Sequence, residues 1–230
     1  MQRRDFLSAL AASWAAPCTK PGDVLAAIPA SGERRLYSRA LLTDPTGARL
    51  RAATLAVERN YIFHYPYANT PCFLLDLGQA APAPGDSAWP GGVGSRGSLV
   101  AYSAICSHKL TYPTRDISFI SYRSAASPQN RHARVIHCCS EHSQYDPAQG
   151  ARVLTGPAPH PLAAILLEHD PKTDALYAIG TLGAEMFEAF FEKFGFRLAM
   201  ENGARGVREP AGSEVRVTEL DNFCRQQVRC

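Results

Sequence analysis

The sequence lacks a strong charge of one sign and lacks an apolar run long enough to cross a bilayer. Its 24 Lys and Arg residues nearly balance 21 Asp and Glu residues, which gives a net charge of +3 without a basic block. The aromatic residues have no regular spacing. These absences argue against nucleic-acid binding, and no segment approaches the roughly 20 apolar residues of a membrane span.

Cysteine is also scarce, with seven residues among 230. That number is too small for a disulfide-rich scaffold at this length. An odd count that includes the adjacent pair Cys138 and Cys139 suits metal ligands plus spare thiols better. Cys224 and Cys230 lie close together in sequence, and two states remain open for them: a bridge formed after export, or free thiols.

What the sequence does contain is two short Cys/His motifs. Cys106-x-His108 is followed by Cys139-x-x-His142, so two loops offer two thiolates and two imidazoles. This donor set suits a four-coordinate zinc ion. It equally suits a two-iron cluster with two sulfurs on one iron and two histidines on the other. The surrounding sequence must decide between them.

The pattern of apolar residues predicts a mainly β chain with one convincing helix at 183–194, which carries an apolar stripe at helical spacing. A short helix is expected at 218–227, and a Pro/Gly-rich loop at 80–97. Strands are expected at 36–42, 52–57, 61–67, 72–77, 98–105, 133–137, 163–168 and 175–181. Two of these strands lead directly into the Cys/His loops, and such strand ends are a common place for functional residues.

The residues after the second motif help to decide between a zinc ion and a two-iron cluster. Ser143, Tyr145 and Asp146 follow His142, and Gly-Pro-Ala-Pro at 156–159 comes shortly afterwards. With the two loops, these residues resemble the Rieske iron–sulfur proteins, closely over 98–165 and more loosely over 36–195. A zinc finger has no need of this additional set.

The resemblance implies an antiparallel Rieske-type β-sandwich with a small cluster-binding subdomain, plus one C-terminal helix. We expect a signal or leader at 1–30, a Rieske domain at 31–200 with its cluster-binding part at about 98–165, and a polar tail at 201–230.

The resemblance also assigns roles. Cys106 and Cys139 would be thiolate ligands of one iron of a single 2Fe–2S cluster, and His108 and His142 would bind the other iron. Ser143 and Tyr145 would donate hydrogen bonds to sulfur and tune the cluster.

The register of the second loop has an alternative. The C-x-x-H spacing favours Cys139 as the ligand, whereas the preceding strand and the Ser143-x-Tyr145 pattern favour Cys138. The cysteine that is not a ligand would be a buried or spare thiol.

Two departures from the respiratory members of the family stand out. Their extra cysteines, which join the two loops, are replaced here by Thr111 and by Glu141 or Ser140, so we expect that bridge to be absent. Glu141 also places a carboxylate beside the cluster, which should lower its potential. Beyond Leu162 only His169 remains, too few histidines for the mononuclear iron of a self-contained oxygenase.

The N-terminus resembles a twin-arginine signal. Arg3 and Arg4 precede Phe6 and Leu7, and a short apolar run extends to Ala16. This pathway carries folded proteins, which would allow cluster insertion before export. We therefore expect a periplasmic protein whose membrane contact, if any, comes from an uncleaved N-terminus or a partner.

The predicted function is electron transfer, with no catalytic residue identified. A redox protein or quinol would dock near His108 and His142, and nucleic acid is not expected as a partner. Two alternatives remain: the small subunit of a periplasmic oxidoreductase of the arsenite-oxidase type, and a structural zinc protein.

Overall fold

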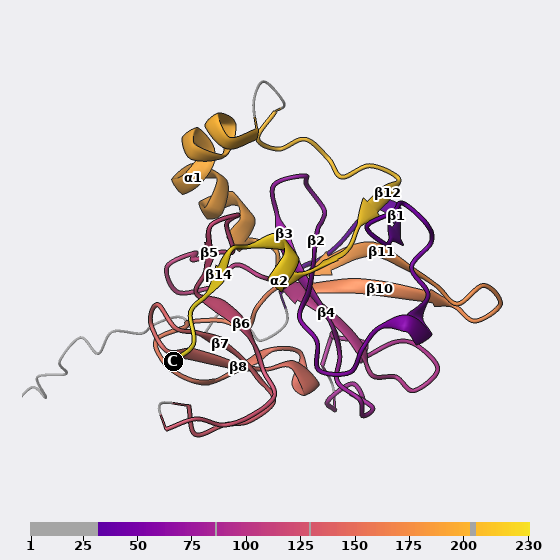
Figure 1. Ribbon diagram of the computed structural model, residues 1–230, viewed down its shortest axis with the longest axis horizontal. Helices are drawn as coiled ribbons and strands as arrows, with labels where there is room; N and C mark the ends of the chain where they lie inside the picture. The colour runs from indigo at the N-terminus through magenta and orange to yellow at the C-terminus, as the bar shows by residue number, and fades with distance from the viewer. Residues whose placement is uncertain (1–31, 86, 129, 203–205) are drawn as a thin grey trace, which may run out of the picture.

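The computed structural model describes residues 32–230 apart from 86, 129 and 203–205 (Figure 1). The predicted signal at 1–30 lies outside this part of the chain. Among the described residues, no helix combines the length and the apolar character that a membrane crossing requires. The predicted mainly β fold with one long helix is confirmed.

The structure has a large and a small β-sheet. The large sheet has eight strands in the order β12-β1-β11-β10-β4-β3-β2-β13, and the small one has four in the order β6-β7-β8-β9. A two-stranded pair, β14-β5, forms a third, separate sheet. The strands are β1 (Arg34–Thr43), β2 (Tyr61–His64), β3 (Pro71–Asp76), β4 (Leu99–Ser103), β5 (Ile117–Ser118), β6 (Ile120–Arg123), β7 (Val135–Cys138), β8 (Ser143–Asp146), β9 (Arg152–Thr155), β10 (Ala164–Asp170), β11 (Ala175–Leu182), β12 (Glu214–Arg216), β13 (Thr218–Glu219) and β14 (Gln226–Gln227).

The centre of the large sheet follows from its apolar runs. Every residue of β3 and β4 is buried, as expected for strands covered on both faces. One apolar cluster fills the space between the large and small sheets and includes Phe73, Tyr102, Ile120 and Ile136. Cys106 and Cys138 are fully buried members of this cluster, so its packing supports their position.

The helix α1 (Met186–Asn202) starts later and ends later than the predicted 183–194. Gly183 has φ of 76°, outside helical geometry. The helix continues past Gly195 through good helix formers at 197–201, with Arg197 and Glu201 paired at 2.6 Å. The predicted apolar stripe packs inward, with Phe187, Phe190 and Phe191 among its buried members; the rest of that stripe, Met186 and Phe194, packs against them.

One predicted element is wrong, and another is shorter than predicted. Residues 52–57 do not form a strand, because η1 (Ala52–Thr54) is a 3₁₀ turn there. Asp174 holds the start of this turn: its carbonyl accepts from the Ala52 N–H at 2.9 Å and its carboxylate from the Ala53 N–H at 3.0 Å. The expected helix at 218–227 is reduced to α2 (Leu220–Phe223) between β13 and β14.

The last part of the sequence is bound to both halves of the fold. β12 pairs with β1 and β13 with β2, so this segment extends both edges of the large sheet. The chain then passes α2 and reaches the small sheet, where it ends beside β6 and β7 (Figure 1). Residues 206–230, expected to be a polar tail, thus link the two sheets.

Candidate cluster-binding site

The first Cys/His loop follows β4 immediately. Cys106 is fully buried, and its backbone N–H donates to the Thr111 carbonyl at 2.8 Å, which closes the loop. The backbone N–H groups of His108 and Lys109 donate to the Cys106 sulfur. A sulfur that accepts backbone N–H groups is prepared to carry negative charge.

The second loop joins β7 to β8 and repeats this pattern at Cys138. Cys138 is fully buried at the end of β7 and lies opposite Ser143 in the ladder. Its sulfur accepts from the backbone N–H groups of Ser140 and Glu141. In each loop the sulfur therefore receives N–H groups from the residues two and three positions later.

The two loops bring the sulfurs of Cys106 and Cys138 into contact. Their hydrogen bond lowers the pKa of Cys106 to about 6 and, together with burial, raises that of Cys138. One proton shared between two buried sulfurs is the physical cause. A cation that replaced this proton would meet two thiolates already surrounded by N–H donors.

The structure does not place Cys139 with the other predicted ligands. Its sulfur forms a disulfide with Cys230, with the two Cα atoms 5.7 Å apart. A sulfur in a disulfide is not a thiolate and cannot bind iron as one. The preference for Cys139 therefore disagrees with this geometry, whereas the alternative, Cys138, faces Cys106. Cys224 is a buried free thiol, so the considered bridge between Cys224 and Cys230 is absent.

The two predicted histidine ligands differ in their surroundings. The Nδ1 atom of His108 is buried and has no hydrogen-bond partner, which is costly for a polar atom unless another group binds it. His142 is exposed and has φ of 58°, in the left-handed region. This backbone conformation lets the extra residue of the C-x-x-x-H spacing from Cys138 fit into the tight connection to β8.

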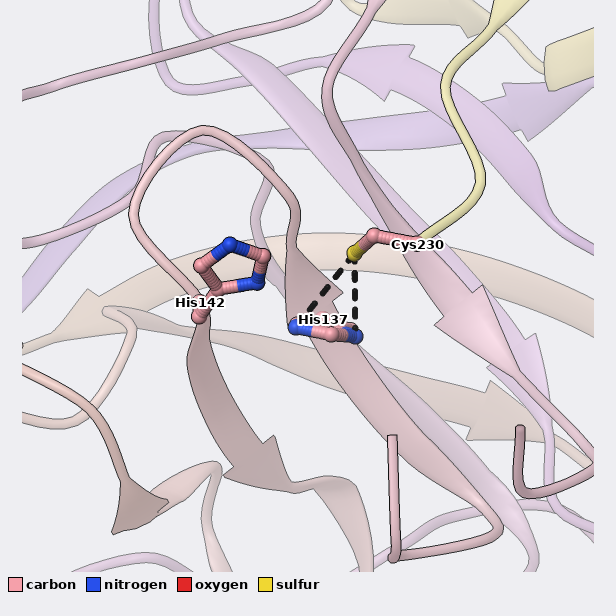
Figure 2. A group of neighbouring side chains, drawn as sticks. All are labelled: His137, His142 and Cys230. Atoms are coloured by element: carbon pink, nitrogen blue, oxygen red, sulfur yellow. Dashed lines mark hydrogen bonds between the residues drawn. The ribbon is translucent and has the colours of Figure 1, made fainter. Parts of the chain in front are cut away.

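A third histidine, His137, lies in β7 just before the second loop, near His142 and Cys230 (Figure 2). Its ring is buried, and its centroid is 5.9 Å from that of His142. Burial lowers its pKa to about 4, and the neighbouring His142 and Arg123 contribute. His137, His142 and Cys230 have potential ligand atoms within 4.8 Å of one another. In the disulfide form Cys230 offers no thiolate, so this trio does not make a complete metal site. The His137 ring nitrogens instead contact the Cys230 sulfur at 3.5 and 3.6 Å.

One of the two predicted hydroxyl donors, that of Tyr145, contacts a sulfur of the site. The Tyr145 hydroxyl lies 3.2 Å from the Cys106 sulfur and accepts from the Ser107 N–H at the same distance. Ser107 directs its own hydroxyl hydrogen to the His160 carbonyl at 2.7 Å. The Tyr145 hydrogen then has two acceptors at 3.2 Å, the Cys106 sulfur and the Ser107 hydroxyl oxygen. The Ser143 hydroxyl is buried without a partner, so a further acceptor would satisfy it.

The Gly-Pro-Ala-Pro segment packs directly on the second loop. A side chain at Gly156, where φ is 93°, would come within 2.5 Å of the Ser143 Cα and 2.6 Å of the His142 carbonyl oxygen. Glycine is therefore required for this close approach. Further along, Pro159 and Pro161 line a cavity of about 710 Å³ beside His108. The segment covers one side of the site and the cavity borders another.

A salt bridge joins the tips of the two loops. The Lys109 ammonium lies 2.7 Å from the Glu141 carboxylate, and this contact lowers the Glu141 pKa. Lys193 of α1 donates to the Lys109 carbonyl at 2.8 Å. The negative charge of Glu141, expected beside the cluster, is thus balanced by Lys109, to which the sequence alone assigned no role. Nothing in the spacing of these residues predicts the pairing.

The donors fit a 2Fe–2S cluster with mixed ligands. They comprise two adjacent buried sulfurs, a buried imidazole nitrogen without a partner and an exposed second imidazole. The Tyr145 hydroxyl contacts the Cys106 sulfur, and the Ser143 hydroxyl is buried without a partner. This chemistry matches the ligand and second-sphere requirements of such a centre.

A scan against protein-family profiles finds no match. Among solved structures, the chain is similar to the soluble domain of the Rieske protein II (soxF) from Sulfolobus acidocaldarius, with 30% sequence identity and a TM-score of 0.45. The similarity covers 63% of this chain and 78% of that one.

Proposed function

We propose that this protein is a Rieske-type electron-transfer protein. In this proposal Cys106 and Cys138 bind one iron of a 2Fe–2S cluster, and His108 and His142 bind the other. The observation that carries the proposal is the equivalence of the two buried cysteines, which contact each other and receive backbone N–H groups in the same pattern. The assignment of Cys138 in place of Cys139 follows from the disulfide at Cys139.

Two serine variants test the ligand assignment. Cys138→Ser should purify with little iron and without the visible absorption of the cluster, because one thiolate ligand is lost. Cys139→Ser should contain iron and sulfide close to the wild-type amounts when freshly prepared, since its sulfur is not a ligand. If Cys138→Ser kept its full cluster content and Cys139→Ser contained no cluster, Cys139 would be the ligand instead of Cys138.

When bound, such a cluster exchanges one electron at a time and couples its redox state to the acidity of its imidazole ligands. The exposed position of His142 lets its outer N–H exchange protons with solvent. The midpoint potential should therefore fall with increasing pH in the alkaline range. A potential that stays constant up to strongly alkaline pH would contradict the coupling.

The proposed docking region for a redox protein or quinol is the surface around His108 and His142. Both histidines belong to the two loop tips joined by Lys109 and Glu141. The same protein could act alone or as the electron-transfer subunit of a larger periplasmic oxidoreductase. Purification from the native membrane and soluble fractions, followed by identification of co-purifying subunits, distinguishes these two roles.

We further propose export of the folded protein by the twin-arginine route, on the basis of Arg3, Arg4, Phe6 and Leu7. Replacing both arginines with lysine should retain the protein in the cytoplasm with its cluster intact. Unchanged export of this variant would contradict the route.

A further inference from the structure

The carboxyl-terminal residues 225–230, called here the strap, are fastened to the segment that follows the first ligand loop. β14 pairs in parallel with β5 through Gln226 opposite Ile117 and Gln227 opposite Ser118. The Val228 N–H donates to the Ser118 carbonyl at 2.8 Å. These backbone hydrogen bonds attach the first half of the strap to the chain between the two ligand loops.

The other end of the strap is attached covalently to the second ligand loop. The Cys139–Cys230 disulfide joins positions 91 residues apart in sequence. Cys139 itself donates its N–H to the Phe119 carbonyl at 2.7 Å, just beyond β5. Ser127 donates to the Cys230 carbonyl at 3.1 Å. The strap thus connects the second ligand loop to the segment that follows the first ligand loop.

The Cys230 sulfur also lies against the His137 ring, with His142 close by (Figure 2). The Cys230 sulfur is 3.5 Å from Nδ1 and 3.6 Å from Nε2 of His137. The His137 ring in turn neighbours that of His142. Cys230 is therefore connected to the second loop in two ways: covalently to Cys139 and by packing against His137.

We propose that Cys230 is a positioning residue for the cluster, which holds the second ligand loop and the His142 ring in place through the disulfide and His137. The inference rests on the function proposed above. In this proposal the strap has the role that a disulfide directly between the two ligand loops would have. The Lys109–Glu141 salt bridge is exposed and adds a weaker link at the tips.

The test compares Cys230→Ser with the matched variant Cys224→Ser in the full-length, cluster-loaded protein. Cys224 is a buried thiol just before the strap, and it donates to the Leu220 carbonyl at 3.3 Å, a bond that serine preserves. Cys230→Ser should lose its cluster at least about tenfold faster under chelator, because closing so long a loop contributes strongly to stability. Its midpoint potential and EPR line shape should differ from wild type, whereas those of Cys224→Ser should not.

Reduction of the wild-type bridge provides a second measurement that does not depend on folding of a variant. Mild phosphine treatment should expose two thiols to labelling and shift the EPR spectrum and the cluster-loss rate in step. If Cys230→Ser or the phosphine-reduced protein had the wild-type cluster-loss rate and EPR spectrum, the proposed role of the strap would be overturned. The proposed function would not be affected. A wild-type protein without iron or a reduced-cluster EPR signal would overturn both this inference and the proposed function.

Discussion

Replacing Tyr145 with Phe should lower the midpoint potential of the cluster while leaving the fold intact. The Tyr145 hydroxyl lies 3.2 Å from both the Cys106 sulfur and the Ser107 hydroxyl oxygen, and the Ser107 hydroxyl directs its own hydrogen to His160. The Tyr145 hydrogen is therefore donated to one of these two atoms, and a negatively charged sulfur is the stronger acceptor. A donor to sulfur stabilises the reduced state more than the oxidised state, since the reduced state has one more negative charge.

The magnitude follows from the strength of this bond. Hydrogen bonds to charged groups contribute about 1.5–3 kcal/mol, and only the difference between the two redox states changes the potential. Taking that difference as about 1 kcal/mol gives a decrease of about 40 mV, because about 59 mV corresponds to a tenfold change for a one-electron couple.

Protein-film voltammetry measures the effect directly. The matched control is Tyr102→Phe, which removes another buried hydroxyl, bonded to the Pro147 carbonyl at 2.7 Å and not to a site sulfur. The control should keep the wild-type potential even where it lowers stability. An unchanged potential in Tyr145→Phe, with full cluster content, would refute the role assigned to this hydroxyl.

Three further outcomes are expected. Lys109→Ala leaves the Glu141 carboxylate unbalanced and should lower the potential, less so at high salt because the charge is screened; voltammetry at two ionic strengths measures this, and a rise would contradict it. Gly156→Ala should reduce cluster content, measured as iron per chain, because the new Cβ would come within 2.5 Å of the Ser143 Cα; full content would show that the segment can move away. Burial lowers the pKa of His64 to about 4, below the unfolded value of about 6.5. The folded state then binds fewer protons, so stability falls as pH decreases from about 6.5 to about 4. His64→Gln should reduce this loss by about 2–3 kcal/mol in urea titrations at pH 7 and 4, and an equal loss in both proteins would exclude His64.

The sequence predicts the parts of the site that depend on local pattern. The loop at Cys106 follows from a Cys/His motif at a predicted strand end, whereas Tyr145 and Gly156 were identified by the resemblance of the residues around them. The apolar stripe of α1 was predictable from its helical spacing. Its C-terminal extension was not, since Gly195 looks like a helix end but lies within a helix that packing supports.

The remaining features depend on contacts between distant residues. The choice between Cys138 and Cys139 could not be made from spacing, because C-x-x-H is the more common pattern and His142 adopts a backbone conformation rare for a residue with a side chain. The partner of Cys139 lies 91 residues away. The odd number of cysteines was the one signal that a thiol would be left over, and it does not identify the pair.

The most direct test of the central claim is metal and sulfide analysis of the purified wild-type protein combined with EPR of its dithionite-reduced form. The account predicts about two iron and two sulfide per chain and the signal of a reduced 2Fe–2S cluster with mixed ligands. Stoichiometric zinc without iron, and no signal after reduction, would contradict it.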